Sequence, residues 1–331
     1  MIKEKLVVLC LVSLLAACGK NVETNAVVSD DGKLSQSKPA NLEVEMLTVP
    51  AGSFIMGSNK VDKDGMKERY GFPEPLYLNE HPERTEVVPG FKMDKYEVNN
   101  AQYKAFLLAA KGVDRGAVPP AWSQNGYGLA HSQMKTMEMD TLRMIGAEHF
   151  KLDMDTRKMV REELIDAMLK QQAITDKFPV VGVTWSDADK FCRWRDARLP
   201  SEKEWEKAAR GEKGNEFPWG DNWDPKLTNT GDDSEWEEGI APIGAYENNS
   251  SPYGIYDLSG NVWEWVEDWY KAIPGSNYKD PEYGEKNKVI KGGSGGMGHY
   301  AISYFYRNAT RQYAEPNTVA EDIGFRCVND L

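Results

Sequence analysis

Apolar residues occur along this chain in short runs that glycine, proline, asparagine and serine separate. Turn signals such as Val49-Pro50-Ala51-Gly52 and Lys291-Gly292-Gly293-Ser294 recur throughout, and there is no internal repeat or heptad pattern. Regular secondary structure is therefore expected to be sparse.

Three segments carry the signals of a helix start. Residues 99–110 begin with two asparagines, and residues 186–195 begin with Ser-Asp. Residues 201–210 have Ser201 at the N-cap position and Glu204 three residues later, which is a capping box. The sequence predicts a helix in each segment.

Short strands are expected at residues 48–56, 91–96 and 180–184, where apolar and β-branched residues gather between turn signals. Together with the helices, these strands make a mixed pattern that is heavy in loops. The predicted fold class is therefore α+β, loop-rich and low in regular structure.

The first residues have the pattern of a lipoprotein signal. Lys3 and Lys5 precede an apolar run over residues 6–15, and small residues lead to Cys18. This run is too short for a permanent membrane span, which needs about 20 apolar residues. We expect residues 1–17 to be removed and Cys18 to be lipidated with acyl chains such as palmitate. The alternatives are an ordinary secretory signal with Cys18 unmodified, or a buried N-terminal strand.

Residues 18–41 are polar and aperiodic, which predicts a lipidated cysteine followed by a flexible tether. Residues 42–331 are long enough for one large domain or two small ones. The formal charge of -12 argues against nucleic acid and against electrostatic binding to anionic lipid, since both require basic clusters. The protein would then be attached to the membrane through the lipid on Cys18. Gly19 is not the aspartate that retains such proteins at the inner membrane, so a periplasm-facing or surface position at the outer membrane is preferred.

Residues 112–178 differ from the rest because methionines and a charged stretch of helical spacing concentrate there. The neighbouring Met137 and Met139 allow a Cu(I) interpretation, since thioether sulfur suits that ion. Methionine is also a common filler of irregular cores, and core packing is the preferred interpretation. His131 and His149 lie in the same segment, without a pattern that brings them together.

Five stretches, in this order, carry a resemblance to a known family. They are Val49–Gly57, Asp94–Asn100, Pro179–Glu202, Tyr253–Trp265 and the pair Lys291–Ser294 with Gly324–Cys327. Together they resemble the formylglycine-generating enzyme or sulfatase-modifying factor family. The resemblance implies one compact, C-type-lectin-like domain over residues 42–331, in which residues 112–178 form an insertion longer than most members carry.

The resemblance also implies structural calcium. Its first site would use Asp257, Gly260, Val262 and Glu264, and oxygen donors of this kind are the ligands that Ca²⁺ takes in a loop. The alternative is that Asp257 caps a turn and Glu264 pairs with an arginine. A second site would use carbonyls near Asn229 and Thr230 with an acid from Asp232 or Asp233, although residues 232–238 depart from the family pattern.

The cysteines limit the chemistry. Related enzymes join cysteines at the positions of Cys192 and Cys327, and an exported protein meets an oxidising compartment, so this disulfide is expected. The oxygen-dependent members also use a cysteine pair that binds copper(I), and those positions fall on Gly298 and Ser303. Neither residue supplies a thiolate, so no copper is expected. Met297 and His299 offer an alternative thioether and imidazole, but His299 is better explained as a residue of a pocket wall.

The remaining pocket candidates are mostly aromatic, with one arginine and one aspartate: Trp263, His299, Ser303, Tyr304, Tyr306, Arg311 and Asp322. In a binding site Arg311 would clamp a carboxylate, and the aromatic rings would stack on a peptide or a small polar ligand. The alternative is that Arg311 pairs with Asp322 and that the rings pack against each other.

The leading functional prediction is an envelope lipoprotein that uses this scaffold for binding or assembly, with a protein partner or a peptide ligand and without formylglycine-generating activity. The alternative is a periplasmic oxidoreductase or maturation enzyme that acts on a peptide or small-molecule precursor without the cysteine pair. A resemblance in fold does not carry the reaction with it, so the chain is more readily explained as a non-enzyme.

Overall fold

The first predicted strand is two strands, β1 (Met46–Val49) and β2 (Gly52–Met56). The computed structural model describes residues 44–331 apart from 125, 232–235, 237–238 and 296–302. Pro50 lies between the two strands and has no N–H to donate to a sheet, which explains the break. The prediction of one continuous strand over residues 48–56 is therefore wrong, because two separate strands form there.

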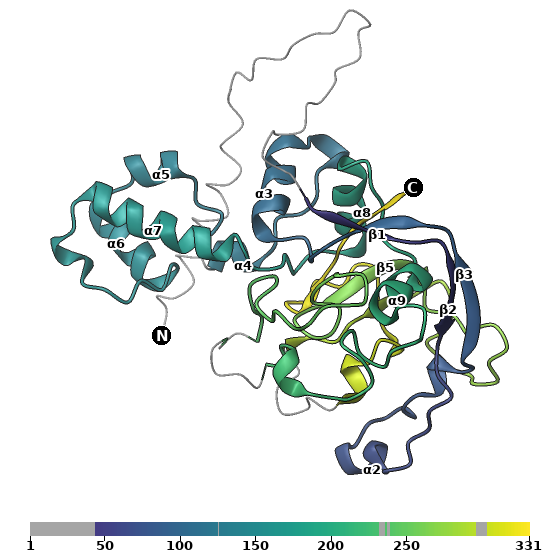
Figure 1. Cartoon of the computed structure of the whole chain (residues 1–331). Coiled ribbons are helices and arrows are strands. Elements are labelled where there is room, and N and C mark those ends of the chain that lie inside the picture. The colour runs from purple at the N-terminus through teal and green to yellow at the C-terminus, as the bar shows by residue number, and fades with distance from the viewer. Residues whose placement is uncertain (1–43, 125, 232–235, 237–238, 296–302) are drawn as a thin grey trace, which may run out of the picture. The chain divides into compact units, whose positions relative to one another are not determined.

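These two strands belong to different sheets. In the first sheet, β4 (Phe91–Asp94) lies between β1 and β9 (Val328–Asp330), and both pairs are antiparallel. In the second, β2 pairs with β3 (Arg84–Val88), and α9 lies against this hairpin (Figure 1). The first sheet thus joins the start of the described chain to its end.

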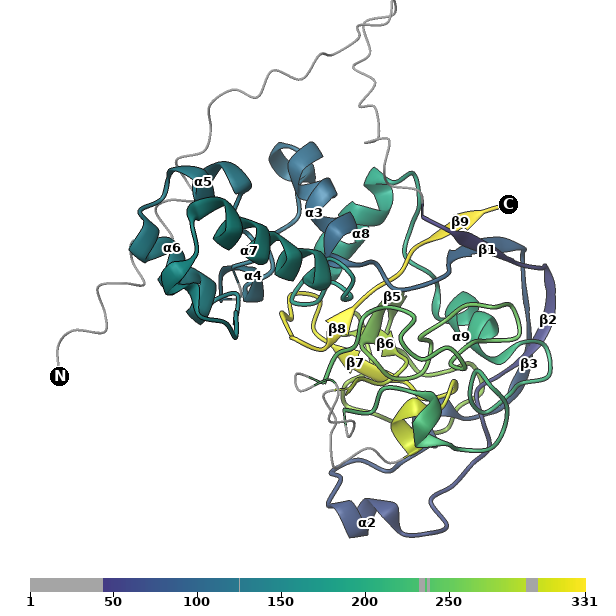
Figure 2. The ribbon, with the colours of Figure 1, turned by 60° about the vertical axis from the view of Figure 1, so that its left-hand side comes forward.

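The third sheet has the strand order β7-β6-β5-β8. Its members are β5 (Trp263–Trp269), β6 (Lys288–Lys291), β7 (Gln312–Ala314) and β8 (Ile323–Gly324). Strands β5 and β8 are parallel, and the other two pairs are antiparallel (Figure 2). The tryptophan-rich stretch Trp263–Trp269 thus forms an inner strand of this sheet.

Residues 180–184 are extended but do not form the predicted strand. Val180 donates to the Val98 carbonyl at 2.8 Å, and a single bridge joins Asn99 to Pro179. Gly182 has a φ of 72°, a left-handed conformation that ends the extended run. The strand prediction is wrong for this reason.

The three predicted helices are confirmed as α3 (Asn100–Ala109), α8 (Trp185–Trp194) and α9 (Glu202–Arg210). Helix α9 has the capping box that Ser201 and Glu204 indicated, and α3 has one as well, between its N-cap Asn99 and Gln102. Helix α8 begins one residue earlier than expected, because Thr184 rather than Ser186 supplies the cap.

The shorter elements lie between these helices and sheets. They are α2 (Met66–Tyr70) and the 3-10 turns η1 (Leu78–Glu80), η2 (Gly112–Asp114), η3 (Thr156–Lys158), η4 (Pro225–Leu227) and η6 (Ser303–Tyr306). None of the helices in the described ranges is both long and apolar enough to cross a bilayer.

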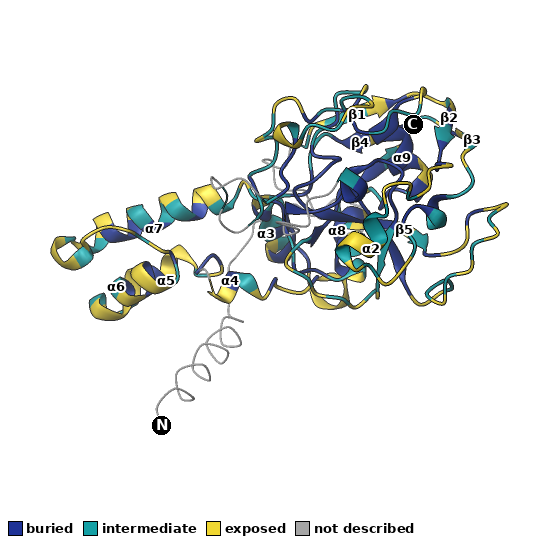
Figure 3. Cartoon of the chain, turned by 90° about the horizontal axis from the view of Figure 1, so that it is seen from below, coloured by how far each residue is buried: buried dark blue, intermediate teal, exposed yellow. Residues whose placement is uncertain are grey.

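Residues 112–178 form a segment of short helices, which we call the helical segment. It contains α4 (Ala121–Gln124), α5 (His131–Thr136), α6 (Met139–Glu148) and α7 (Arg161–Thr175). Helices α5, α6 and α7 enclose a small core of their own, with buried positions on their inner sides (Figure 3). Met134 and Met168 are fully buried in this core, while Met137 and Met139 pack against it. The preference for core packing over a copper site agrees with this placement.

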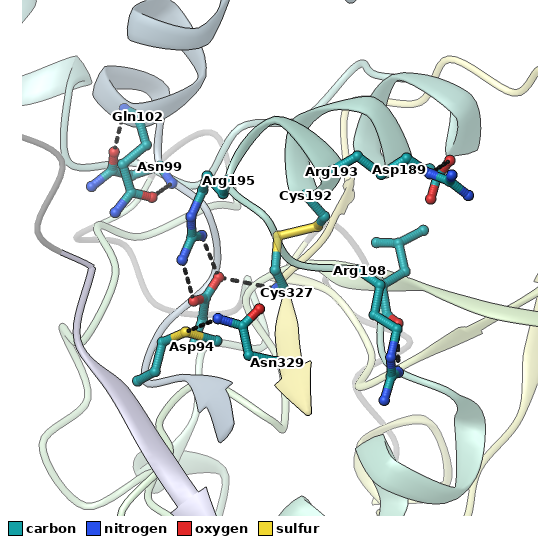
Figure 4. Close-up of a disulfide and its surroundings, with 12 residues drawn as sticks. Asp94, Asn99, Gln102, Asp189, Cys192, Arg193, Arg195, Arg198, Cys327 and Asn329 are labelled. Atoms are coloured by element: carbon teal, nitrogen blue, oxygen red, sulfur yellow. Dashed lines mark hydrogen bonds and ion pairs between the residues drawn. A yellow bond between two sulfur atoms is a disulfide. The ribbon is translucent and has the colours of Figure 1, made fainter. Parts of the chain in front are cut away.

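The rest of the chain has two further hydrophobic clusters, which we together call the family core. The first cluster surrounds α3 and α8 and also takes in Trp122 and Tyr127 of the helical segment, and the second lies among β1, β2, β4 and α9. The rings of α3 and α8 pack together with Phe325, and Tyr103 stacks on Phe191 with ring centres 5.8 Å apart. The Cys192–Cys327 disulfide lies at this contact and joins α8 to the residue before β9 (Figure 4). Beside it, Arg195 makes two hydrogen bonds of 2.7 and 2.8 Å to Asp94, as Figure 4 shows. The disulfide that the resemblance implied is present.

Candidate functional site

Arg311 is an interior residue rather than a clamp for a ligand. Its Nη2 donates to Glu202 Oε2 at 3.0 Å, and its Nε donates to Glu202 Oε1 at 2.5 Å. Its Nη1 and Nη2 also donate to the carbonyls of Asn79 and Lys271, at 2.9 and 3.1 Å. The alternative, a pair with Asp322, is also wrong, since the partner of Arg311 is Glu202 in the first turn of α9.

Three other candidates gather around Ser294 instead. The hydroxyl of Tyr306 donates to the Ser294 carbonyl at 3.0 Å, and the Ser294 hydroxyl donates to Asp322 at 3.1 Å. The backbone N–H of Trp263 donates to the Asp322 carbonyl at 2.9 Å. Tyr306 is fully buried and stacks on Trp223, so its ring is part of the packing.

The last candidates lie at the edge of the described chain. Ser303 is the half-buried first residue of η6, and Tyr304 follows it in the core. Gly298 and His299 lie outside the described residues, as does Met297. The described structure therefore neither supports nor opposes a role for His299.

A cavity of about 250 Å³ lies next to η6. Of the residues that line it, only Tyr304 is among the pocket candidates that the sequence indicated. We call it the aromatic cavity. Its walls come from residues 72–79, from residues 270–280 after β5, and from η6 and β7. The lining rings are Phe72, Tyr270, Tyr278, Tyr304, Phe305 and Tyr313, and the polar residues are Glu74, Asn79, Asp280 and Gln312.

The rings of the aromatic cavity hold one another in place. Tyr270 stacks on Tyr313 at 4.6 Å, and Phe305 meets Tyr304 and Phe72 edge to face at 5.0 and 5.5 Å. The sequence did contain a signal, since Phe72 starts a run of proline and apolar residues and tyrosines recur after residue 269. That signal has no period, so it could not show that these segments meet.

The predicted first calcium site contains an ion pair. Both carboxylate oxygens of Glu264 accept from Arg326, at 2.6 and 2.7 Å, and one also accepts from Trp205 Nε1 at 2.9 Å. All three side chains are fully buried. For Glu264, the structure thus contains the arginine pair that the sequence left open as an alternative to a metal ligand.

Two further carboxyl groups are buried nearby. Burial and the neighbouring Asp257 raise the pKa of Glu97, and burial also raises the pKa of Asp257 to about 6. Asp257 accepts from the Gly244 N–H at 2.6 Å, and Glu97 accepts from Asn261 at 3.0 Å. The other oxygen of Glu97 is buried, meets no N–H donor among the described residues and faces the Asp257 carboxyl group, which is compatible with a shared proton or with a nearby cation.

The fit to calcium is therefore incomplete. Asp257 and this Glu97 oxygen are hard oxygen donors of the kind Ca²⁺ accepts, but Glu264 has no free oxygen. Within the described ranges, no three or more Asp, Glu, His or Cys side chains are grouped as metal ligands. A cation here would rely on backbone carbonyls such as those of Gly260 and Val262.

The second predicted site holds an internal hydrogen-bond network. The Asn229 amide nitrogen donates to Gly239 O and to Asn261 Oδ1, and the Asn229 carbonyl accepts from the Asn261 N–H. The Thr230 carbonyl accepts from Tyr306 at 3.4 Å. The acids expected to complete the site, Asp232 and Asp233, lie outside the described residues.

These features define a class: an α+β domain with three small sheets, a disulfide to its carboxyl end and buried arginine–glutamate pairs. A family model described as the sulfatase-modifying factor enzyme 1-like domain matches residues 32–331. The chain belongs to this family, which includes the formylglycine-generating enzymes.

Its relatives carry names of both active and inactive proteins. It is 33% identical over 319 residues to a formylglycine-generating enzyme of Mus musculus, covering 90% of this chain and 78% of the relative. It is 30% identical over 308 residues to an inactive C-alpha-formylglycine-generating enzyme 2 of Bos taurus, covering 86% and 88%. Among solved structures it is similar to PvdO from Pseudomonas aeruginosa, with a TM-score of 0.54, 20% identity and coverage of 86% and 94%. The last comparison supports the fold alone.

Proposed function

We propose that this protein is an envelope lipoprotein that uses the family scaffold for binding or assembly and does not form formylglycine. The observation that carries the proposal is the cysteine inventory. The described chain contains Cys192 and Cys327, and both sulfurs are in one disulfide. Since the copper-dependent reaction needs thiolates, the described domain has no group to start it.

The state of Arg311 supports the same proposal. A clamp for a substrate carboxylate needs free guanidinium N–H groups, and most of those of the buried Arg311 are used by Glu202 and two backbone carbonyls. The aromatic cavity, in contrast, is an apolar concave surface with a few polar groups, which is typical of a ligand site. The described structure thus contains a surface suited to ligand binding, whereas it lacks the thiolate ligands that the copper chemistry needs.

The first test is a peptide oxidation assay on the purified full chain, with an active member of the family in parallel. A cysteine-containing sulfatase peptide is incubated with oxygen and copper(I), and the aldehyde product is measured by mass spectrometry. We expect product with the active enzyme and none with this chain. Product formed by this chain would contradict the proposal and favour the oxidoreductase alternative.

The second test concerns the membrane anchor. Cys18→Ser should move the protein from the membrane fraction to the soluble fraction, because several acyl chains are needed for firm anchoring. Cys10→Ser is the matched control, since it changes a cysteine of the predicted signal that carries no lipid. Equal behaviour of the two variants would reject lipidation at Cys18.

A third test concerns the protein partner. Crosslinking in intact membranes should join the wild-type protein to a defined partner if the role is assembly.

We also retain calcium at the Asp257 loop as a proposal. The ion would supply positive charge beside Glu97 and Asp257, and the chain would hold it through Asp257 and the carbonyls of Gly260 and Val262. Metal content after calcium dialysis of chelator-washed protein should be about one ion per chain. Absence of bound calcium would remove the claim.

A further inference from the structure

All charged residues in the described lining of the aromatic cavity are acidic. Glu74 and Asp280 line it, and no Lys, Arg or His belongs to the part of its wall that the structure describes. No described Lys or Arg forms an ion pair with either carboxylate. The cavity therefore has a negative charge that no neighbouring side chain of the described wall compensates.

Asp280 is held in a fixed position. One oxygen accepts from the Tyr270 hydroxyl at 2.8 Å, and the other accepts from the backbone N–H of Glu282 at 2.8 Å. These bonds come from neutral donors, so they orient the carboxylate without neutralising it. A carboxylate oxygen has further lone pairs, which leaves acceptor capacity for a ligand.

The rings around these carboxylates offer π surfaces. Tyr278, Tyr304 and Phe305 line the same cavity, and the face of an aromatic ring attracts an ammonium or guanidinium group within about 6 Å of its centre. Arg311 lies 5.2 Å from the Tyr270 ring, but Glu202 compensates its charge. Rings and carboxylates favour the same kind of ligand.

Asn79 adds an acceptor. Its amide nitrogen donates to the Tyr270 hydroxyl at 2.9 Å and to the Arg311 carbonyl at 3.0 Å. Its side-chain oxygen is buried and lacks a hydrogen-bond partner in the described structure. A buried acceptor without a partner is unfavourable, and a shift of the Asn79 side chain toward a ligand N–H in the cavity would satisfy it.

We propose that the aromatic cavity binds an organic cation, that is, a guanidinium or alkylammonium group, between its rings and Asp280. The proposal rests on the binding function proposed above and names the ligand class of that function. The cavity volume of about 250 Å³ suits one such group with its alkyl chain. The cation is either a basic side chain of a protein partner or a free amine, and both sources share this chemistry.

Titration calorimetry on the purified full chain tests the proposal with matched probes. N-acetyl-arginine amide carries the guanidinium, and N-acetyl-citrulline amide has nearly the same shape without the charge. We expect the arginine probe to bind at least tenfold more tightly than the citrulline probe. Equal affinity of the two probes, or no binding of either, would overturn the proposal.

Two variants of equal charge change locate the site. Asp280→Asn keeps the side-chain shape and should weaken binding of the arginine probe at least tenfold. Asp166→Asn changes an exposed aspartate of α7 that pairs with Lys170, and should alter the affinity by less than twofold. If both variants behave alike, the site is elsewhere and the proposal is wrong. Tyr278→Leu should also weaken binding, and thermal unfolding of each variant shows that the fold is intact.

A third probe identifies the source of the cation. Tetramethylammonium has the charge but no N–H, so binding as tight as that of the arginine probe supports any organic amine as ligand. Binding of the arginine probe alone supports a basic side chain and a role for the Asn79 acceptor. Failure of the cation preference would leave the peptide oxidation result untouched, so the two proposals fail separately.

Discussion

The family core and the helical segment are stabilised in different ways. The family core contains buried ion pairs, among them Arg326–Glu264 and Arg311–Glu202. The helical segment has its ion pairs on the surface, such as Asp166–Lys170, and a small core of leucine, isoleucine, methionine and phenylalanine.

The reason for the difference lies in the backbone. A helix satisfies its own N–H and C=O groups, so the helical segment needs only an apolar contact between helices. The family core consists largely of loops, whose buried polar groups need partners from elsewhere in the chain. Its buried arginines supply several donors each, and Arg326 reaches the carbonyls of Asp94 and Lys95 as well as Glu264. Changes to the two regions should therefore have different effects.

Removal of the disulfide is expected to have the largest effect. Cys192 and Cys327 are 135 residues apart, and on the chain-entropy model the loss of this link costs on the order of 4 to 5 kcal/mol of stability. Cys192→Ala with Cys327→Ala should lower the denaturant midpoint of the family core. The closed loop does not include the helical segment, so local hydrogen exchange in α6 and α7 should be unchanged. Faster local exchange there would show that the two regions are coupled.

Loss of the Arg326–Glu264 ion pair should have the next largest effect on stability. Arg326→Ala leaves Glu264 buried without its counter-charge, and breaking a buried pair in this way destabilises by about 3 to 5 kcal/mol. Arg157→Ala is the control, because that arginine pairs with Asp155 at the surface, where water screens the charges and the pair contributes little to stability. Urea unfolding compares the two. Similar losses would contradict the view that buried pairs stabilise the loops.

Acid should affect the family core through Glu206. Burial opposes the charged form, but Lys291 and Arg210 outweigh it and hold the pKa at about 2, below the ordinary value of 4.5. The stability from this group is therefore present above about pH 4.5 and is lost as the pH falls toward 2. A shift of this size corresponds to about 3 kcal/mol.

The measurement is urea unfolding between pH 5 and pH 2, with the Glu206→Gln variant beside the wild type. The wild type should lose stability with falling pH more steeply than the variant, because only the wild type gains a proton at this site on unfolding. Parallel slopes would remove Glu206 as the cause.

Local patterns predicted local structure well. The capping residues Asn99 and Ser201 and their partners three residues later lie within one helical turn, so the sequence indicated these helix starts correctly. Residues 180–184 have strand-like side chains, but the backbone at Gly182 turns left-handed, which composition does not show.

The contacts of the candidate site join residues that are far apart in the sequence. Local sequence patterns therefore could not predict them. Arg311 binds Glu202, which is 109 residues away, and the wall of the aromatic cavity joins segments near residues 72, 270 and 305. No period or spacing in the sequence relates these positions. The disulfide could be predicted only because a family resemblance supplied its two ends.

The smallest effect on the whole molecule is expected from the core of the helical segment. Leu142 is fully buried between α6 and α7, and Leu142→Ala should destabilise by about 3 kcal/mol through lost contacts and a cavity. The loss should be confined to α5, α6 and α7, because this core is separate from that of the β-sheets. Hydrogen exchange should therefore accelerate in these helices and remain unchanged in β5 and β6.

The same helix provides the control. Met144 is 44% exposed. Met144→Ala should change the hydrogen-exchange rates of these helices only slightly, by an amount that corresponds to less than about 0.5 kcal/mol of stability. If Leu142→Ala instead lowered protection in β5 and β6, the helical segment would be an integral part of the family core. Its apolar packing and the buried ion pairs would then stabilise one cooperative unit, rather than two regions that meet different requirements of helix and loop.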